Sequence, residues 1–161
     1  MIAAAQPVAY SVLVATAAVL LWVAVNDFRS FKIPNNIILV LVALFCLYVL
    51  VSGRWAVLHW HAGFAAVTFL LLLACYAQNW MGGGDVKLLT VAFLWTGAHC
   101  ALIFLLIMLA LVLVHTLLAK LEWVHSQRVH GRIKVAFAPS IAGGLIGVFM
   151  SGCLSPMYLP H

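Results

Sequence analysis

The amino-acid sequence predicts an all-α polytopic membrane protein, because its composition and its patterning both exclude a soluble fold. Of the 161 residues, 67% are hydrophobic and only 7% are charged, and the mean hydropathy is +1.20. A soluble domain of this length cannot cover so much apolar surface. The apolar segments are continuous and do not alternate as the strands of a β-barrel do. We therefore expect a single transmembrane domain over residues 1–161, built from six helices.

The first two apolar segments are separated by a polar link. The first covers about residues 7–25, and its length and the absence of a preceding basic region favour a retained helix over a signal peptide. The link covers residues 26–36 and contains Pro34, Asn35 and Asn36. Proline is tolerated at a helix start and asparagine caps helices, so a second helix is expected to begin here and to end near residue 51.

The remaining segments follow from one constraint on length. The apolar run from Val86 to Leu118 would extend roughly 50 Å as one helix, which exceeds a hydrocarbon core of about 30 Å. We expect a break near Thr96 and Gly97, which leaves a short fourth helix that starts inside the membrane. A turn is expected at residues 52–54 and a polar loop at residues 120–134. The third, fifth and sixth segments are expected over about residues 61–77, 98–119 and 135–152.

The basic residues predict the orientation of these segments. Seven of the eight fall in odd-numbered loops, and Arg54 alone falls in an even-numbered one. The seven are Arg29, Lys32, Lys87, Lys120, Arg128, Arg132 and Lys134. Because cytoplasmic loops carry an excess of Lys and Arg, we expect the odd loops in the cytoplasm and both termini outside. We expect Arg128, Arg132 and Lys134 to contact anionic lipid, and no nucleic acid to bind.

The four cysteines, Cys46, Cys75, Cys100 and Cys153, are scattered singly through apolar segments. None of them is part of a CxxC pair, so we expect small buried hydrophobic side chains. Neither a disulfide framework nor a metal site is indicated, and no cofactor is expected.

Residues 81–87, with the sequence MGGGDVK, are the centre of the functional prediction. Three glycines permit a tight turn, and Asp85 follows them directly. In a soluble protein the aspartate would be interpreted as a helix cap. An ionisable residue within a membrane segment instead marks a functional site by default. The short fourth helix would take Asp85 below the surface, into a wet cleft lined by protein.

A second acid, Asp27, is expected at the same face of the membrane. Two carboxylates that share a site suit amide hydrolysis, because one takes a proton from water while the protonated one polarises the carbonyl. Asp85 at a helix N-terminus is favoured as the carboxylate, and hence as the general base, over Asp27 at a helix C-terminus. The third acid, Glu122, is expected to pair with basic neighbours at the surface.

Three stretches together resemble the type IV prepilin peptidases. Residues 82–87 resemble the GxGD signature of that family, with its Val-Lys continuation. Asp27 and the downstream Ile33-Pro34-Asn35 are similar to the family's first catalytic aspartate and the turn that follows it. Residues 137–144, which include Pro139, resemble the opening of the family's last helix. Ala136 departs from the proline that many relatives carry at that point.

The resemblance implies a membrane aspartyl protease of the bacterial inner membrane with Asp27 and Asp85 as its catalytic pair. Gly82, Gly83 and Gly84 would then form the active-site loop. The implied substrate is a prepilin or pseudopilin, cut at the cytoplasmic face between its short basic leader and its hydrophobic helix. The small size and the absence of a CxxC-bearing insert resemble the Tad/Flp branch, and they imply that N-methyltransferase activity is lacking.

Five further residues are expected to line this site, either in contact with the substrate or tuning the acidity of the aspartates. They are Lys32, Lys87, Pro34, Asn35 and Pro139. For the two lysines, anchoring to the cytoplasmic surface is an equal alternative. The main alternative for the whole chain is a small proton- or ion-coupled transporter that uses the two acids. The lack of an inverted repeat argues against that alternative.

Overall fold

The computed structural model describes residues 2–30, 33–121, 127–129, 132–134 and 137–154. The helices are α1 (Ile2–Ser30), α2 (Asn35–Ser52), α3 (Trp55–Ala77), α4 (Gly83–Lys120) and α5 (Ala138–Met150), and the strands are β1 (Gln127–Val129) and β2 (Arg132–Lys134). The two short strands pair antiparallel. Every other described element is a helix, which confirms the predicted helical class.

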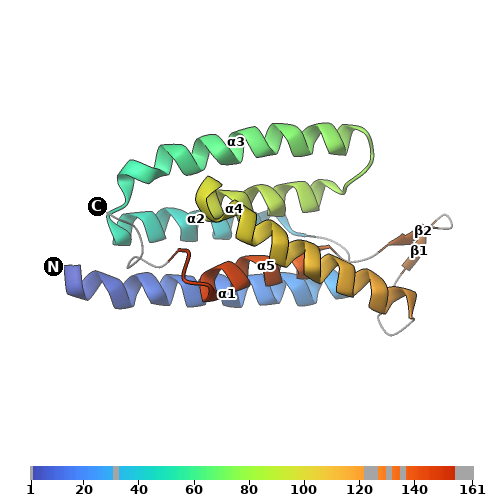
Figure 1. The fold of residues 1–161 in the computed structure, drawn as a ribbon, viewed down its shortest axis with the longest axis horizontal. Coiled ribbons are helices and arrows are strands. Elements are labelled where there is room, and N and C mark those ends of the chain that lie inside the picture. The colour runs from blue at the N-terminus through green and yellow to red at the C-terminus, as the bar shows by residue number, and fades with distance from the viewer. Residues whose placement is uncertain (1, 31–32, 122–126, 130–131, 135–136, 155–161) are drawn as a thin grey trace.

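The helices form an elongated bundle with two distinct ends (Figure 1). Helix α4 packs against α2, α3 and α5, and α1 packs against α2 and α5. One end, which we call the glycine-loop end, comprises the described residues of 26–36 together with residues 78–85 and 137–139. The opposite end, the Arg54 end, comprises residues 52–55 and 151–154. The β1–β2 hairpin lies at the glycine-loop end (Figure 1).

Four helical stretches are long and apolar enough to cross a membrane, so the chain is a multi-pass membrane protein. They are Gln6–Ser30, Asn35–Ser52, Trp55–Ala77 and Gly83–Leu118. Helix α5 has 13 residues and is about 20 Å long, which is short of a core of about 30 Å. The six full spans expected from the sequence are therefore not confirmed.

Helix α1 continues through residues 26–30, which the sequence analysis assigned to a polar link. Nothing in this stretch breaks a helix, and Pro34 is the first proline after it. The Ser30 hydroxyl donates to the carbonyl of Asn26 at 2.9 Å, within the last turn. The consequence is that Asp27 is carried by a helix and not by a loop.

The boundaries of α2 are set by a proline and a glycine, and α3 follows directly. Helix α2 starts directly after Pro34, as predicted, but without a capping hydrogen bond from a side chain, so the expected asparagine cap is wrong. It ends at Gly53, whose φ of 68° is in the left-handed region, and the N–H of Arg54 returns to the carbonyl of Val49 at 3.2 Å. Helix α3 then begins at Trp55, one turn and more before the predicted start.

The predicted break in the long apolar run is confirmed at Gly97. Its φ of 57° and ψ of −175° lie outside the helical region, so α4 is two helices joined at this residue. The break leaves carbonyl groups in the preceding turn without the helical N–H groups that would bind them. The His61 ring replaces one of these donors, because its Nδ1 donates to the carbonyl of Leu94 at 2.9 Å. Trp95, fully buried beside the break, donates from its indole to the carbonyl of Leu41. The bend is thereby fixed to both α2 and α3.

We expect Gly97→Ala to destabilise the fold by about 1–3 kcal/mol, because the backbone conformation there is essentially restricted to glycine. A Cβ at this position would also lie 2.8 Å from the His61 ring. Thermal unfolding of the detergent-solubilised protein measures the effect. Gly63→Ala on α3 is the matched control, since no atom lies within 4 Å of a Cβ there. Equal melting of both variants would contradict this account of the bend.

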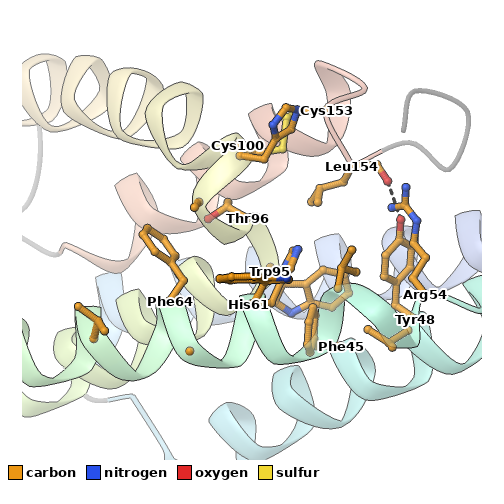
Figure 2. A pocket seen from close by; sticks show the side chains of 17 residues that line it. Phe45, Tyr48, Arg54, His61, Phe64, Trp95, Thr96, Cys100, Cys153 and Leu154 are labelled. Atoms are coloured by element: carbon orange, nitrogen blue, oxygen red, sulfur yellow. Dashed lines mark hydrogen bonds between the residues drawn. A yellow bond between two sulfur atoms is a disulfide. The ribbon is translucent and has the colours of Figure 1, made fainter. Parts of the chain in front are cut away.

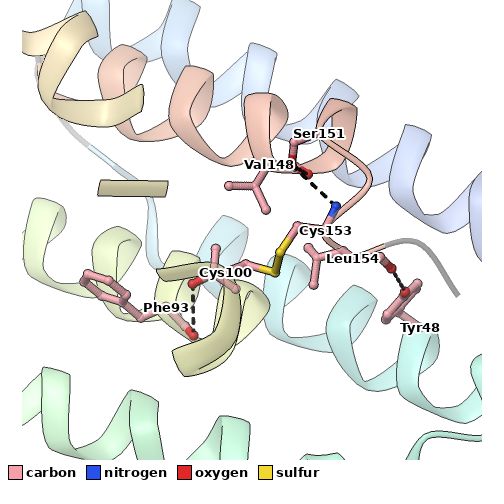
Figure 3. Close-up of a disulfide and its surroundings, with 8 residues drawn as sticks. Tyr48, Phe93, Cys100, Val148, Ser151, Cys153 and Leu154 are labelled. Atoms are coloured by element: carbon pink, nitrogen blue, oxygen red, sulfur yellow. Dashed lines mark hydrogen bonds between the residues drawn. A yellow bond between two sulfur atoms is a disulfide. The ribbon is translucent and has the colours of Figure 1, made fainter. Parts of the chain in front are cut away.

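The structure contains a disulfide between Cys100 and Cys153, so the prediction that the cysteines form no disulfide is wrong (Figure 3). Their Cα atoms are 6.1 Å apart although 53 positions separate them in the chain. The bend at Gly97 brings the start of the second half of α4 beside the residues after α5, which no local spacing could reveal. Cys46 is exposed and Cys75 is half-buried, so these two are not the buried side chains that were expected.

Candidate active site

The glycine loop is shaped first by the end of α3. Asn79 has a φ of 58°, a left-handed conformation that asparagine tolerates better than most residues. The N–H of Trp80 returns to the carbonyl of Cys75 at 3.1 Å, which closes the helix end. Helix α4 starts at Gly83, so Asp85 lies within its first turn and is not the capping residue. The loop therefore places the Asp85 carboxylate at the beginning of α4, where the helix dipole favours a negative charge.

Each of the three glycines leaves room for a different neighbour. A Cβ on Gly82 would lie 3.0 Å from the Asp85 carboxylate oxygen Oδ2. At Gly83 it would touch the ring of Tyr76 at 3.4 Å, and at Gly84 it would touch the side chain of Ile33 at 3.4 Å. The glycines therefore permit the close approach of the acid itself, of the last turn of α3 and of the segment before α2.

A direct hydrogen bond joins two residues that the sequence analysis assigned to the site. The Lys87 ammonium donates to the Asn35 side-chain oxygen at 2.9 Å, across the starts of α4 and α2. Both side chains are exposed. With the contact between Ile33 and Gly84, this bond holds the segment that follows α1 against the helix that carries Asp85.

Asp27 is buried, with 5% of its surface exposed, near the end of α1. Its oxygen Oδ2 accepts a hydrogen bond from the backbone N–H of Ala138 at 3.2 Å. Ala138 is the first residue of α5, and Pro139 after it has no N–H, so the aspartate satisfies a donor that the helix start would leave unpaired. The sequence carried a signal for the start of α5, but none for its contact with Asp27.

This contact adds a second helix end to the surroundings of Asp27. Asp27 was expected to meet only the C-terminal end of a helix, but it also faces the N-terminal end of α5. Asp85 lies at the N-terminal end of α4. Asp27 therefore lies beside two helix ends of opposite effect, because the end of α1 disfavours its negative charge and the start of α5 favours it. Asp85 lies beside a helix start, so its assignment as the base stays a prediction.

The two acid-bearing helices approach each other through side chains and not through their backbones. Helix α1 packs on α2 and α5, and these two in turn pack on α4. A ring contact between Phe28 and His115, with centroids 5.1 Å apart, joins α1 to the second half of α4. Asp27 and Asp85 thus lie at the same end of the bundle, with α2 and α5 packed against both of their helices (Figure 1).

The remaining predicted site residues are distributed as follows. Pro34 is the residue before α2 and Pro139 is in the first turn of α5, both at the glycine-loop end. Lys32, Glu122 and Ala136 lie outside the described residues. Arg128 is on β1, and Arg132 and Lys134 are on β2. The residues that sequence reasoning missed are Tyr76, which covers Gly83, and Ala138, which binds Asp27.

The fold is that of a membrane-embedded protein, because several of its helices are long and apolar. Two aspartates lie at one end of the bundle, and one of these, Asp85, directly follows the glycine loop. The protein therefore belongs to the class of membrane proteins with an acidic site. Comparison with known families adds the specific class. The model of the type IV leader peptidase family matches residues 14–117, and the chain belongs to this family. The match includes both Asp27 and Asp85, and it indicates an aspartic-type peptidase rather than a transporter. No curated protein and no solved structure matches the chain.

Proposed function

We propose that the protein is an aspartic endopeptidase that removes the short basic leader of a type IV prepilin or pseudopilin of the Flp type, at the cytoplasmic face of a bacterial inner membrane. The observation that carries the proposal is the placement of Asp27 and Asp85 at one end of the bundle, each beside the start of a helix. Membership of the leader peptidase family supports the reaction and the substrate class.

The chemistry assigned to the pair is hydrolysis of one peptide bond. One carboxylate takes a proton from a water molecule, and the other, protonated, donates a hydrogen bond to the scissile carbonyl oxygen. The resulting tetrahedral intermediate then expels the amine, which leaves with a proton from the pair. The burial of Asp27 and the glycine loop around Asp85 support this role, because both hold a carboxyl group in a fixed position.

The proposed orientation places the glycine-loop end in the cytoplasm. The end of α1, which carries Arg29, and both ends of α4, which carry Lys87 and Lys120, are on this side of the bundle (Figure 1). The strands that carry Arg128, Arg132 and Lys134 are on the same side. Excess basic residues favour the cytoplasmic side, where the three strand residues are proposed to contact anionic lipid. The disulfide lies at the Arg54 end (Figure 2), and disulfides persist in oxidising compartments such as the periplasm. Two independent features thus support the same orientation.

The orientation is tested by labelling introduced cysteines in intact cells with a maleimide that does not cross membranes. We expect Arg54→Cys to be labelled from outside and Lys87→Cys to be labelled only after the cells are opened, both in a chain in which Cys46 and Cys75 are replaced by alanine. The reverse pattern would refute the proposed orientation.

The proposed reaction is tested by expressing the protein together with a Flp-type prepilin in cells that lack their own leader peptidase. We expect a prepilin shortened by its leader, with a new amino terminus that mass spectrometry finds unmethylated. The absence of N-methylation is proposed because no CxxC pair is present in the sequence. A prepilin that stays full length, while the protein is folded and in the membrane, would refute the proposed reaction.

A further inference from the structure

A second site is suggested by a cavity at the Arg54 end, and neither aspartate is part of its lining (Figure 2). Its volume is about 590 Å³, within the range of roughly 300–1,000 Å³ that is typical of small-molecule sites. It lies between α2, α3 and the bend in α4, and the disulfide forms part of its wall. The side chains that line it are mostly apolar or aromatic, among them Phe45, Val57, Phe64, Val67, Trp95 and Leu154.

One wall of the cavity is formed by a helix that is little covered by the rest of the bundle. Helix α3 contributes Trp60, Gly63 and Val67, and it is the most exposed of the long helices, with Ala65 as its only buried residue among those described. Trp60 is 73% exposed, and aromatic residues of this kind collect where the hydrocarbon meets water. An occupant of the cavity would therefore enter from the lipid phase.

Arg54 supplies a positive charge at this cavity. Its side chain is half-buried and lies beside the Tyr48 hydroxyl (Figure 2), which itself donates to the carbonyl of Leu154 at 2.5 Å. Both acidic residues that the structure describes, Asp27 and Asp85, are at the opposite end of the bundle. Within the described part of the chain, no carboxylate is therefore placed to neutralise this guanidinium, and a phosphate group would do so in two-pronged geometry.

Two of the polar side chains that line the cavity are engaged in hydrogen bonds within the bundle. His61 donates to the carbonyl of Leu94, and the Trp95 indole donates to the carbonyl of Leu41. His99 also lines the cavity, but most of the lining is apolar, which suits a hydrocarbon chain better than a polar ligand. The charge at Arg54 and the apolar interior together match a molecule with one anionic group and a long apolar tail.

We propose that this cavity binds a phospholipid, with an acyl chain in the apolar interior and the phosphate on Arg54. The hydrophobic helix of a substrate is also apolar, and the experiments below distinguish it from a lipid. A bound lipid would fill the space between α3 and the bend in α4, and it would not take part in the reaction at the glycine-loop end.

The proposal is tested by native mass spectrometry of the full-length protein released from nanodiscs that contain phosphatidylglycerol. We expect one lipid to be retained per wild-type chain, and about tenfold weaker retention for Arg54→Gln, the size expected for loss of one charge-assisted hydrogen bond. Arg54→Lys should restore retention in part, because it keeps the charge but not the planar fork. Inorganic phosphate alone should not raise the melting temperature, whereas phosphatidylglycerol should.

A second variant fills the cavity without touching Arg54. Gly63 lines the cavity and no atom lies within 4 Å of a Cβ built there, so Gly63→Trp should occupy the space and abolish retention. Ala66→Trp on the same helix, outside the cavity lining, is the matched control and should retain lipid. Retention that neither Arg54→Gln nor Gly63→Trp changes would overturn the proposal. So would a Gly63→Trp variant that keeps its lipid and loses prepilin cleavage, since that result would assign the cavity to the substrate.

Discussion

Asp27→Asn and Asp85→Asn should each lower the rate of leader removal about 10²- to 10⁴-fold, the loss expected when a group that transfers protons is removed. The rate is measured with purified protein in nanodiscs and a prepilin, by quantifying the shortened product over time. Asparagine is nearly isosteric with aspartate, and its side-chain oxygen still accepts a hydrogen bond. The Asp27→Asn variant should therefore keep the contact with the N–H of Ala138, and the fold should not change.

Two controls separate chemistry from structure in this experiment. Asp27→Ala removes the contact with Ala138 as well, so it should lower stability by about 1 kcal/mol in addition to abolishing cleavage. Glu122→Gln should leave the rate unchanged. Cleavage that survives either asparagine variant, or that is lost only when the protein also melts earlier, would contradict the assignment of the two aspartates.

Gly84→Val should lower the rate of cleavage about 10²-fold, which is the size of effect that a displacement of about 1 Å has in an active site. The Cβ of a residue at position 84 lies 3.4 Å from Ile33, an ordinary contact, so Gly84→Ala should be tolerated. The two further methyl groups of valine should instead push the segment before α2 away from Asp85. The measurement is the same cleavage assay, together with thermal unfolding to show that the bundle persists.

The pair of residues provides its own control. Because Ile33 is the neighbour that Gly84→Val would displace, Ile33→Ala should make room and restore cleavage in the double variant. Ile33→Ala alone should have a smaller effect than Gly84→Val. A double variant that is no more active than Gly84→Val would show that this contact does not position the site.

Much of the fold could be predicted from the lengths of the apolar segments, because a segment that crosses a membrane must be a helix of limited length. The long apolar runs, the turn at Gly53 and the break at Gly97 are each dictated by length or by glycine conformation, and the structure has all three. The sixth segment was predicted over about residues 135–152, and the described part of it forms a helix only over Ala138–Met150. Composition alone does not distinguish a short helix from a complete span.

The sequence predicted which residues belong to the site better than it predicted which of them are in contact. Asp85 and the three glycines are adjacent in sequence, so their association needed no tertiary information. The contact between Asp27 and Ala138 joins positions 111 apart, and the disulfide joins positions 53 apart. Such pairings depend on how α1, α4 and α5 pack, which no periodicity encodes. For the same reason the contact of Asp27 with the start of α5 was not part of the prediction that Asp85 is the base.

The most direct test of the central claim asks whether Asp27 and Asp85 face one shared site. The double variant Asp27→Cys with Asp85→Cys is made in a chain without Cys46 and Cys75, and it is treated with a short bismaleimide. The backbones of α1 and α4 do not approach closely, so no direct disulfide is expected, but the reagent should join the two positions. Peptide mass spectrometry identifies the link.

Two further pairs calibrate this measurement. Asn35→Cys with Lys87→Cys should link readily, since these side chains are 2.9 Å apart, and Asp27→Cys with Arg54→Cys should not link across the bundle. We predict that the aspartate positions link as efficiently as the first pair. Linking no greater than that of the second pair would contradict the shared site, and with it the proposed peptidase mechanism.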